Sequence, residues 1–113
     1  MPYVIILGYS FSPAWLALPR AERQRLKEAH IGPLVAKYAD RVRMRFFDAE
    51  AFQTRFTDFA LVETEDLQAY YFLVEELRDS PLVGQGYLTV KDIFLGIEDG
   101  HQAYEGSLQE AGA

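Results

Sequence analysis

The sequence contains no cysteine and no long apolar run, and each absence excludes a class of protein. Without cysteine, the chain cannot form a disulfide, a thiolate metal site or a cysteine nucleophile. No apolar stretch approaches the roughly 20 residues that a membrane-spanning helix needs. The apolar start at 1–9 lacks the basic leader and cleavage site of a signal peptide. We therefore expect a soluble, cytoplasmic protein with no membrane partner.

Motifs that bind common cofactors are also absent. The sequence has no nucleophile elbow, phosphate loop, dinucleotide fingerprint or zinc signature, and Gly84 and Gly86 lack the rest of any such motif. We therefore expect no cofactor and no resident metal. The net charge of −6 argues against nucleic acid as a partner.

Charge is distributed unevenly along the chain. Residues 1–45 carry 8 Lys or Arg and 3 Asp or Glu, whereas residues 46–113 carry 3 and 14. Three interpretations fit this pattern: an anionic-ligand site near the first helix, acid–base pairing between protomers, or an ordinary solvated surface.

Half of the 113 residues are hydrophobic, which suits one packed domain. The apolar patterns predict four strands, at 3–9, 41–47, 57–63 and 87–97. They also predict a helical turn at 13–18, a helix from Arg20 that is interrupted at Gly32-Pro33, and a helix that Thr64 caps. On the helix from Arg20, the core side is predicted to hold Leu26, Ala29, His30, Pro33 and Leu34. We divide the chain into a domain at 1–98 and a tail at 99–113, which we expect to be poorly ordered unless it docks.

The order strand–helix–strand–strand–helix–strand predicts an α+β fold of the ferredoxin-like βαββαβ type. Its four-stranded antiparallel sheet has both helices on one face. The other face is left uncovered. Two such sheets packed face to face form a dimeric α+β barrel, so a homodimer is expected.

Several segments resemble the darcynin family in order across residues 12–98. The most specific is Met-Arg-Phe-Phe-Asp-Ala-Glu-Ala-Phe at 44–52; the others are 12–18, 30–37, 57–58, 63–70, 74–80 and 93–98. The resemblance implies a ferredoxin-like, dimeric α+β-barrel fold. This sequence departs from the family pattern in its tail and at 82–86, where a tryptophan is missing.

Three residues are candidates for catalysis. His30 lies on the apolar side of a helix, where it serves either as an acid–base group or as a hydrogen-bonded core histidine. Arg45 and Asp58 lie on neighbouring strands. If they share a face, they form an ion pair; alternatively, Arg45 holds a carboxylate or enolate oxygen.

Acidic and aromatic residues give further candidates. Asp48 and Glu50 follow a strand and either bind a cation or cap a turn, and the second interpretation is the more common one. Glu98 with His101 is a weaker metal candidate. A pocket for a flat molecule is predicted from the aromatic residues Tyr9, Trp15, Phe47, Tyr70 and Tyr87, although such residues also form ordinary cores.

Three functions fit these observations. The first is a cofactor-independent tailoring enzyme that acts on a small aromatic or polyketide-like compound by proton transfer, cyclisation or oxygenation. The second is a non-catalytic module that binds a small-molecule ligand. The third is an interaction protein whose uncovered sheet face forms the dimer.

Overall fold

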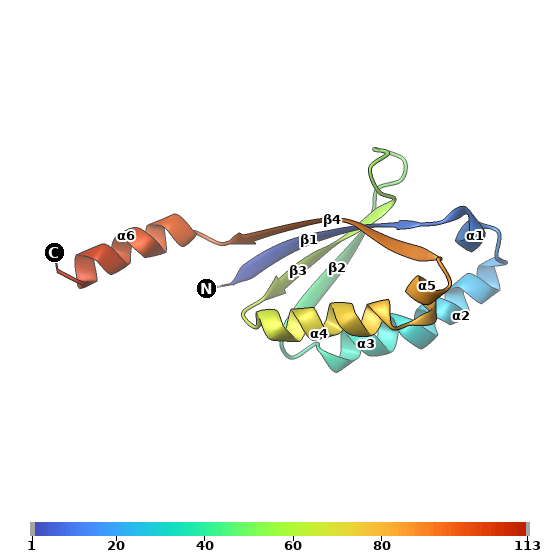
Figure 1. Ribbon diagram of the computed structural model, residues 1–113, viewed down its shortest axis with the longest axis horizontal. Helices are drawn as coiled ribbons and strands as arrows, with labels where there is room; N and C mark the ends of the chain where they lie inside the picture. Colours follow the sequence, from blue (N-terminus) through green and yellow to red (C-terminus); the bar gives the residue numbers. More distant parts are fainter. Residues whose placement is uncertain (1, 113) are drawn as a thin grey trace.

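The computed structural model describes residues 2–112, in which a four-stranded sheet carries helices on one face (Figure 1). The strands are β1 (Tyr3–Phe11), β2 (Val42–Asp48), β3 (Asp58–Thr64) and β4 (Leu88–Ile97). They lie in the order β2-β3-β1-β4, and every neighbouring pair is antiparallel. This is the ferredoxin-like topology that the sequence predicts, so the expected fold class is confirmed.

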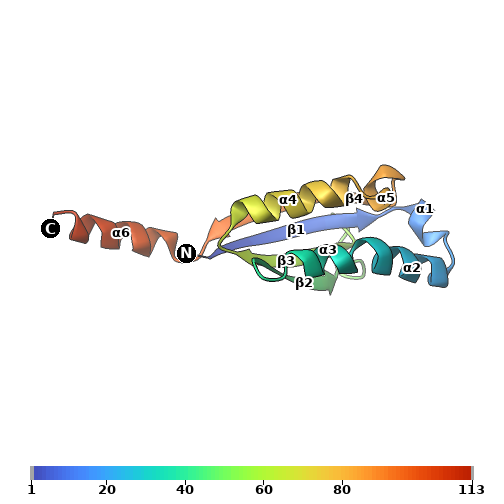
Figure 2. The ribbon, with the colours of Figure 1, turned by 90° about the horizontal axis from the view of Figure 1, so that it is seen from below.

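The helices form a second layer over the sheet (Figure 2). This layer consists of α2 (Arg20–His30), α3 (Gly32–Lys37) and α4 (Leu67–Arg78), with the short helices α1 (Pro13–Leu16) and α5 (Pro81–Gly84) beside it. The sixth helix, α6 (Gly100–Glu110), extends away from this body. Within residues 2–112, no helix is both long and apolar enough to cross a membrane.

The helix-covered face of the sheet holds the hydrophobic core. Side chains alternate between the faces of a strand, and in β1 the buried residues Ile5 and Leu7 alternate with the half-buried Val4 and Ile6. In β2 and β3 the core positions include Val42, Ala60 and Val62; from the helices, Leu26, Leu73 and Leu77 are buried against them.

The expected interruption at Gly32-Pro33 separates α2 from α3, but the predicted core side of this segment is only partly correct. Leu26 is buried and Leu34 is half-buried, whereas Ala29 and Pro33 are exposed. Proline starts a new helix well because its missing N–H has no partner in the first turn. The residues of α3 therefore start at a new angle around the helix axis, so a single helical projection does not describe α2 and α3 together.

The start of α4 also differs from the prediction, because Asp66 caps this helix in place of Thr64. The Asp66 carboxylate accepts a hydrogen bond from the Ala69 backbone N–H at 3.0 Å. Thr64 is instead the buried last residue of β3, and its hydroxyl donates to the Arg41 carbonyl at 2.7 Å. Both residue types cap helices, and the strand end decides between them.

The expectation of a poorly ordered tail is wrong for its described part, because residues 100–110 form α6. This segment contains mostly good helix formers, and Asp99 turns the chain into it from a left-handed conformation with φ of 50°. No residue of α6 is buried. The helix therefore forms without docking on the rest of the described chain.

The sheet face opposite the helices, here called the open face, is apolar at its centre. The Phe47 and Phe59 rings stack with centroids 4.9 Å apart, and Phe56 meets Phe59 edge-on. Phe56 lies across Gly8, where a Cβ atom would come within 2.7 Å of the ring. Glycine at this position therefore lets one aromatic ring cover part of the open face.

Candidate functional site

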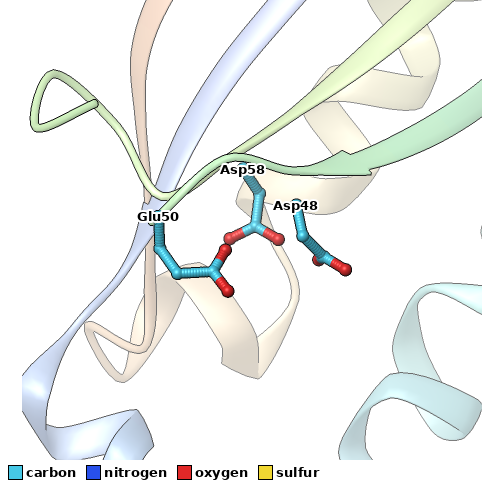
Figure 3. A group of neighbouring side chains, drawn as sticks. All are labelled: Asp48, Glu50 and Asp58. Carbon is cyan, nitrogen blue, oxygen red and sulfur yellow. The ribbon is translucent and has the colours of Figure 1, made fainter. Parts of the chain in front are cut away.

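The end of the β2–β3 hairpin brings acidic side chains together on the helix-covered side of the sheet. Asp48 is the last residue of β2, Asp58 is the first residue of β3, and the two are direct partners in the antiparallel register. Glu50 follows in the connecting loop. Each of the three offers an oxygen, and these oxygens all lie within 4.8 Å of one another (Figure 3).

Backbone and hydroxyl hydrogen bonds hold this hairpin end in place. The Ala49 N–H donates to the Thr57 carbonyl at 2.8 Å, which closes the neck of the loop. The Thr57 hydroxyl donates to Asp58 Oδ1 at 2.6 Å and accepts from the Phe11 N–H at 3.0 Å. Through Thr57, Asp58 is therefore hydrogen-bonded to β1 as well as to its own hairpin.

A cavity of about 340 Å³, here called the α2 cavity, opens between this acidic end and α2. Phe11 and Phe46 give it aromatic walls, Lys27 supplies a positive charge, and Asp48 and Asp58 supply negative charge. The full lining is Tyr9, Phe11, Lys27, Glu28, Ile31, Gly32, Phe46, Asp48 and Asp58. Apolar walls with a few convergent polar groups are typical of small-molecule sites.

A second cavity of about 210 Å³, the Trp15 cavity, adjoins the first and shares Phe11, Lys27, Asp48 and Asp58 with it. Trp15 is buried and stacks on the Phe11 ring at 4.8 Å. Arg23 also lines this space, and its Nε is buried without a hydrogen-bond partner in the described chain. A buried donor of this kind requires an acceptor.

The crowding of acids at this end changes two pKa values. Desolvation by burial raises the pKa of Asp58; its hydrogen bond from Thr57 opposes this effect, and the neighbouring carboxylates Asp48 and Glu50 add to it. Burial also raises the pKa of the Tyr9 hydroxyl, and the negative charges of Asp58 and Asp48 raise it further. Both effects follow from placing like charges and a phenol in one partly desolvated space.

Of the predicted site residues, Tyr9, Trp15 and Asp58 gather around these two cavities. Tyr87 lines neither cavity, but its ring packs beside that of Trp15, with the ring centroids 5.8 Å apart. Phe47 is on the open face, stacked on Phe59. Tyr70 packs against the core, where its hydroxyl is buried without a partner in the described chain.

Arg45 and Asp58 do not share a face of the sheet, so the condition for an ion pair between them is not met. Arg45 is opposite Leu61 in the register and projects onto the open face, where its guanidinium lies 3.4 Å from Glu63. Asp58 faces the helices instead. The two residues lie on neighbouring strands, as predicted, but an odd offset between their positions places them on opposite faces.

His30 lies in a third place, a groove between the α2–α3 segment and α4 that also contains Lys37, Glu76 and Asp79. It lines neither the α2 cavity nor the Trp15 cavity. The structure thus does not bring His30, Arg45 and Asp58 together, and their catalytic roles stay predictions.

Three residues that line these cavities, Arg23, Lys27 and Phe11, are not marked as site residues by any sequence motif. Arg23 and Lys27 belong to a strongly basic helix, and the excess of positive charge in residues 1–45 was the available signal. The structure places Asp48 and Glu50, the predicted cation candidates, in one acidic group with Asp58. The other candidate pair, Glu98 and His101, is not part of such a group, and His101 pairs with Glu105 at 3.0 Å. Only the register of the β2–β3 pair shows that Asp58 lies beside Asp48.

Comparison with known proteins places the chain among the darcynins. The family model of Darcynin, a domain of unknown function, matches residues 2–111. Darcynin from Chromobacterium violaceum is 46% identical over 78 residues, which are 69% of this chain and 98% of that protein. Darcynin 1 from Acinetobacter baumannii is 38% identical over 90 residues, which are 80% of this chain and 99% of that protein.

Solved structures with the same fold include two kinds of protein. A heme-binding protein from Thermus thermophilus matches with a TM-score of 0.78 and 23% identity over 92% of this chain. Chlorite dismutase from Candidatus Nitrospira defluvii in complex with imidazole matches with a TM-score of 0.74 and 15% identity over 84% of it. The matches cover only 44% and 39% of those longer chains. At these identities the comparison establishes the fold.

Proposed function

This chain belongs to the Darcynin family, and we propose that it binds a small aromatic molecule carrying an anionic group in the α2 cavity. The observation that supports this proposal most strongly is the lining of that cavity, where Phe11 and Phe46 stand beside Lys27 and three acidic residues, Glu28, Asp48 and Asp58. Aromatic walls favour a flat ligand. Lys27 favours a ligand with an anionic group, and so does Arg23 in the adjoining Trp15 cavity, whose buried Nε has no hydrogen-bond partner among residues 2–112.

The carboxylates on the opposite side of the cavity complete this recognition pattern. Asp48 and Asp58 are hydrogen-bond acceptors when ionised and would bind a hydroxyl or amine donor on the same ligand. A hydroxylated or amino-substituted aromatic acid has both groups. We therefore take this class as the ligand to be tested.

The arrangement favours binding over catalysis. The predicted acid–base group His30 and the predicted anion holder Arg45 lie in separate places, on the outer side of the helix layer and on the open face. The α2 cavity also adjoins the Trp15 cavity, so the ligand site has a second compartment. A tailoring reaction would need several catalytic groups around one ligand, and only Asp58 of the three predicted catalytic residues lines the α2 cavity.

Heme is bound by one of the proteins that share this fold, and the interior between the sheet and α3–α4 does not fit it. The space directly between the sheet and α3–α4 is a cavity of only about 30 Å³, lined by side chains such as Leu7, Met44 and Leu73. That volume accommodates about one or two water molecules. Neither histidine of the chain lines it: His30 is in the groove beside α4 and His101 is on exposed α6.

A homodimer formed through the open face is part of the proposal. Phe47 and Phe94 are 39% and 48% exposed there, and between them lie the half-buried Phe59, Leu61 and Ile6. A contiguous apolar patch of this kind is typical of an association surface. The same patch on two copies is self-complementary about a two-fold axis.

Binding is tested with a panel of hydroxy- and amino-substituted benzoates, using thermal shift and isothermal titration calorimetry. We expect at least one compound to bind in the micromolar to millimolar range, and Lys27→Met to weaken it about tenfold, the loss of one charge-assisted hydrogen bond. Lys91→Met, on exposed β4, is the matched control and should bind normally. If no compound binds, or if Lys27→Met binds like the control, the ligand proposal is wrong.

The dimer is tested separately by native mass spectrometry across micromolar concentrations. We expect the wild type to be dimeric and Phe94→Glu to be monomeric, because a charge on the open face opposes its burial. Phe52→Glu, in the loop, where Phe52 is 88% exposed, should remain dimeric. A monomeric wild type at the highest concentration would rule out the dimer.

A further inference from the structure

The second half of β4 exposes apolar side chains on the helix-covered side of the sheet. Near the start of the strand, Leu88 is buried on this side. The later residues Ile93, Leu95 and Ile97, here called the β4 ledge, are between 47% and 52% exposed. Ile5, the register partner of Leu95 on β1, has no exposed surface. The helix layer therefore covers β1 but stops short of the end of β4.

The helix that follows this strand, α6, has an exposed apolar side. Tyr104 and Leu108 are four residues apart in α6, so they lie on one side of the helix, and both are exposed. The helix has only 11 residues, and Gly100 and Gly106 are among them. Helices shorter than about 12–15 residues are marginal in water unless they pack on another element. We therefore expect α6 to be stabilised by packing on an apolar surface.

The connection between β4 and α6 directs the helix away from its own body. The Glu98 backbone N–H donates to the Pro2 carbonyl at 3.2 Å, which extends the pairing beyond the end of β4. Asp99, with its φ of 50°, then turns the chain into α6. Figures 1 and 2 both show α6 beyond the end of the sheet. The radius of gyration is accordingly 17.2 Å, compared with about 13 Å for a compact chain of roughly 100 residues. The β4 ledge is therefore left uncovered by the α6 of its own chain.

From this arrangement we propose that two copies of the chain exchange their C-terminal helices. α6 of one copy packs Tyr104 and Leu108 on the β4 ledge of the other, and two-fold symmetry makes the exchange mutual. Each copy then donates one helix and accepts one, so the ledge and the apolar side of α6 are both covered. The removal of these side chains from water drives the exchange.

The dimensions of the two surfaces agree. Tyr104 and Leu108 are about 6 Å apart along the helix axis, because each residue of an α-helix adds about 1.5 Å. Neighbouring ledge side chains such as Ile93 and Leu95 are about 6.6 Å apart, because each strand residue adds roughly 3.3 Å. The whole of α6 is about 16 Å long and the ledge about 13 Å. One α6 is therefore long enough to cover the whole ledge, with matching spacings between the apolar side chains.

The exchange rests on the homodimer proposed above, because two copies must meet before so short a helix can dock between them. It does not depend on the ligand or on the α2 cavity. The ledge and the open face lie on opposite sides of the sheet, since Leu95 pairs with Ile5 and Phe94 with Ile6. One copy can therefore use both surfaces: the open face brings the copies together, and the exchanged helices add affinity.

The test is disulfide cross-linking, which has no background because the chain lacks cysteine. A ¹⁵N-labelled Leu108→Cys protein is mixed with unlabelled Leu95→Cys protein, oxidised with glutathione disulfide and measured by intact mass spectrometry. We expect the mixed disulfide dimer to be the main covalent product. Leu16→Cys, at an exposed position on α1 at the other end of the sheet, is the matched control for Leu95→Cys and should give little mixed dimer.

A second pair of variants measures how much α6 adds to the affinity of the dimer. Leu108→Glu should raise the dimer dissociation constant at least about tenfold, because the new carboxylate would be buried without a partner. Gln109→Glu adds the same charge on another side of α6 and should leave the constant unchanged. Native mass spectrometry across micromolar concentrations measures both. No residue of α6 is buried in the single chain, so both variants should fold.

The possible failures can be told apart. A dimeric wild type without the mixed disulfide, or equal dissociation constants for Leu108→Glu and Gln109→Glu, would overturn the exchange and leave the homodimer standing. A wild type that stays monomeric at every concentration would overturn both. A variant carrying Leu95→Cys and Leu108→Cys together tests the remaining arrangement. If its disulfide closes within one chain where the wild type is dimeric, α6 covers its own ledge and the exchange is wrong.

Discussion

The two faces of the sheet differ in how their apolar side chains are covered. On the helix-covered face, Ile5 has no exposed surface and Leu7 has 2%, because α2, α3 and α4 pack over them. On the open face, neighbouring Ile6 is half-buried and Phe94 is 48% exposed. The helix-covered face therefore supplies the buried core, whereas the open face keeps large apolar side chains in contact with solvent. The acidic residues Asp48, Glu50 and Asp58 and the α2 cavity lie on the first face, where the end of the β2–β3 hairpin faces α2.

The largest expected effect comes from truncating consecutive isoleucines on the two faces. Ile5→Ala should lower the free energy of unfolding by about 2–5 kcal/mol, because it leaves a cavity in the core. Ile6→Ala should cost clearly less in dilute, monomeric protein, since this side chain is already partly in water. Urea unfolding followed by circular dichroism measures both. Equal losses would show that the faces do not differ as described.

A smaller effect is expected where the open face is already covered. Gly8→Ala would place a methyl group 2.7 Å from the Phe56 ring, so the ring must move, at a cost of about 1–3 kcal/mol. Gly96→Ala, on β4, has no heavy atom within 4 Å of the new Cβ and is the control. Thermal unfolding separates the two variants. A Gly8→Ala protein as stable as Gly96→Ala would mean that Phe56 does not pack on this face.

The pH dependence of stability sharpens the description of the acidic end. Burial and the charges of Asp58 and Asp48 raise the pKa of Tyr9 above its ordinary value of 10.0. The unfolded chain then releases this proton before the folded chain does, so stability that is present below pH 10 is lost as the pH rises above it.

Tyr9→Phe should remove this component of the alkaline loss, measured as the urea midpoint in steps above pH 10. Lys27, which lines the same cavity, is present in both proteins. Tyr104→Phe, on exposed α6, should keep the wild-type profile. Identical profiles for Tyr9→Phe and wild type would contradict the placement of this hydroxyl beside the carboxylates.

The smallest effect is expected from α6, which contributes to neither face. A chain that ends at Glu98 should unfold within about 0.5 kcal/mol of the full chain, because no residue of α6 is buried. The measurement is urea unfolding at a concentration where both proteins are monomeric. A large loss would mean that α6 packs on the body.

The topology could be predicted because its signals are local. The two-residue alternation of β2, with Val42 and Met44 on one side and Arg43 and Arg45 on the other, reports burial directly. The break at Gly32-Pro33 and the order of elements are also readable from neighbouring residues. The capping residue of a helix is harder to predict from sequence. Thr64 and Asp66 are both of types that bond the first backbone N–H groups of a helix, and in α4 it is Asp66 that does so.

The site required the tertiary structure. The sequence alone determined that β2 and β3 are adjacent and that Asp48, Glu50 and Asp58 lie near their ends. Only the pairing register decided that Asp58 lies opposite Asp48 and faces the helices, away from Arg45. The packing of α2 then brought Lys27 to the same cavity from a distant part of the chain. Local patterns report which side of an element is buried; which distant side chains meet depends on strand register and helix packing, which involve the whole chain.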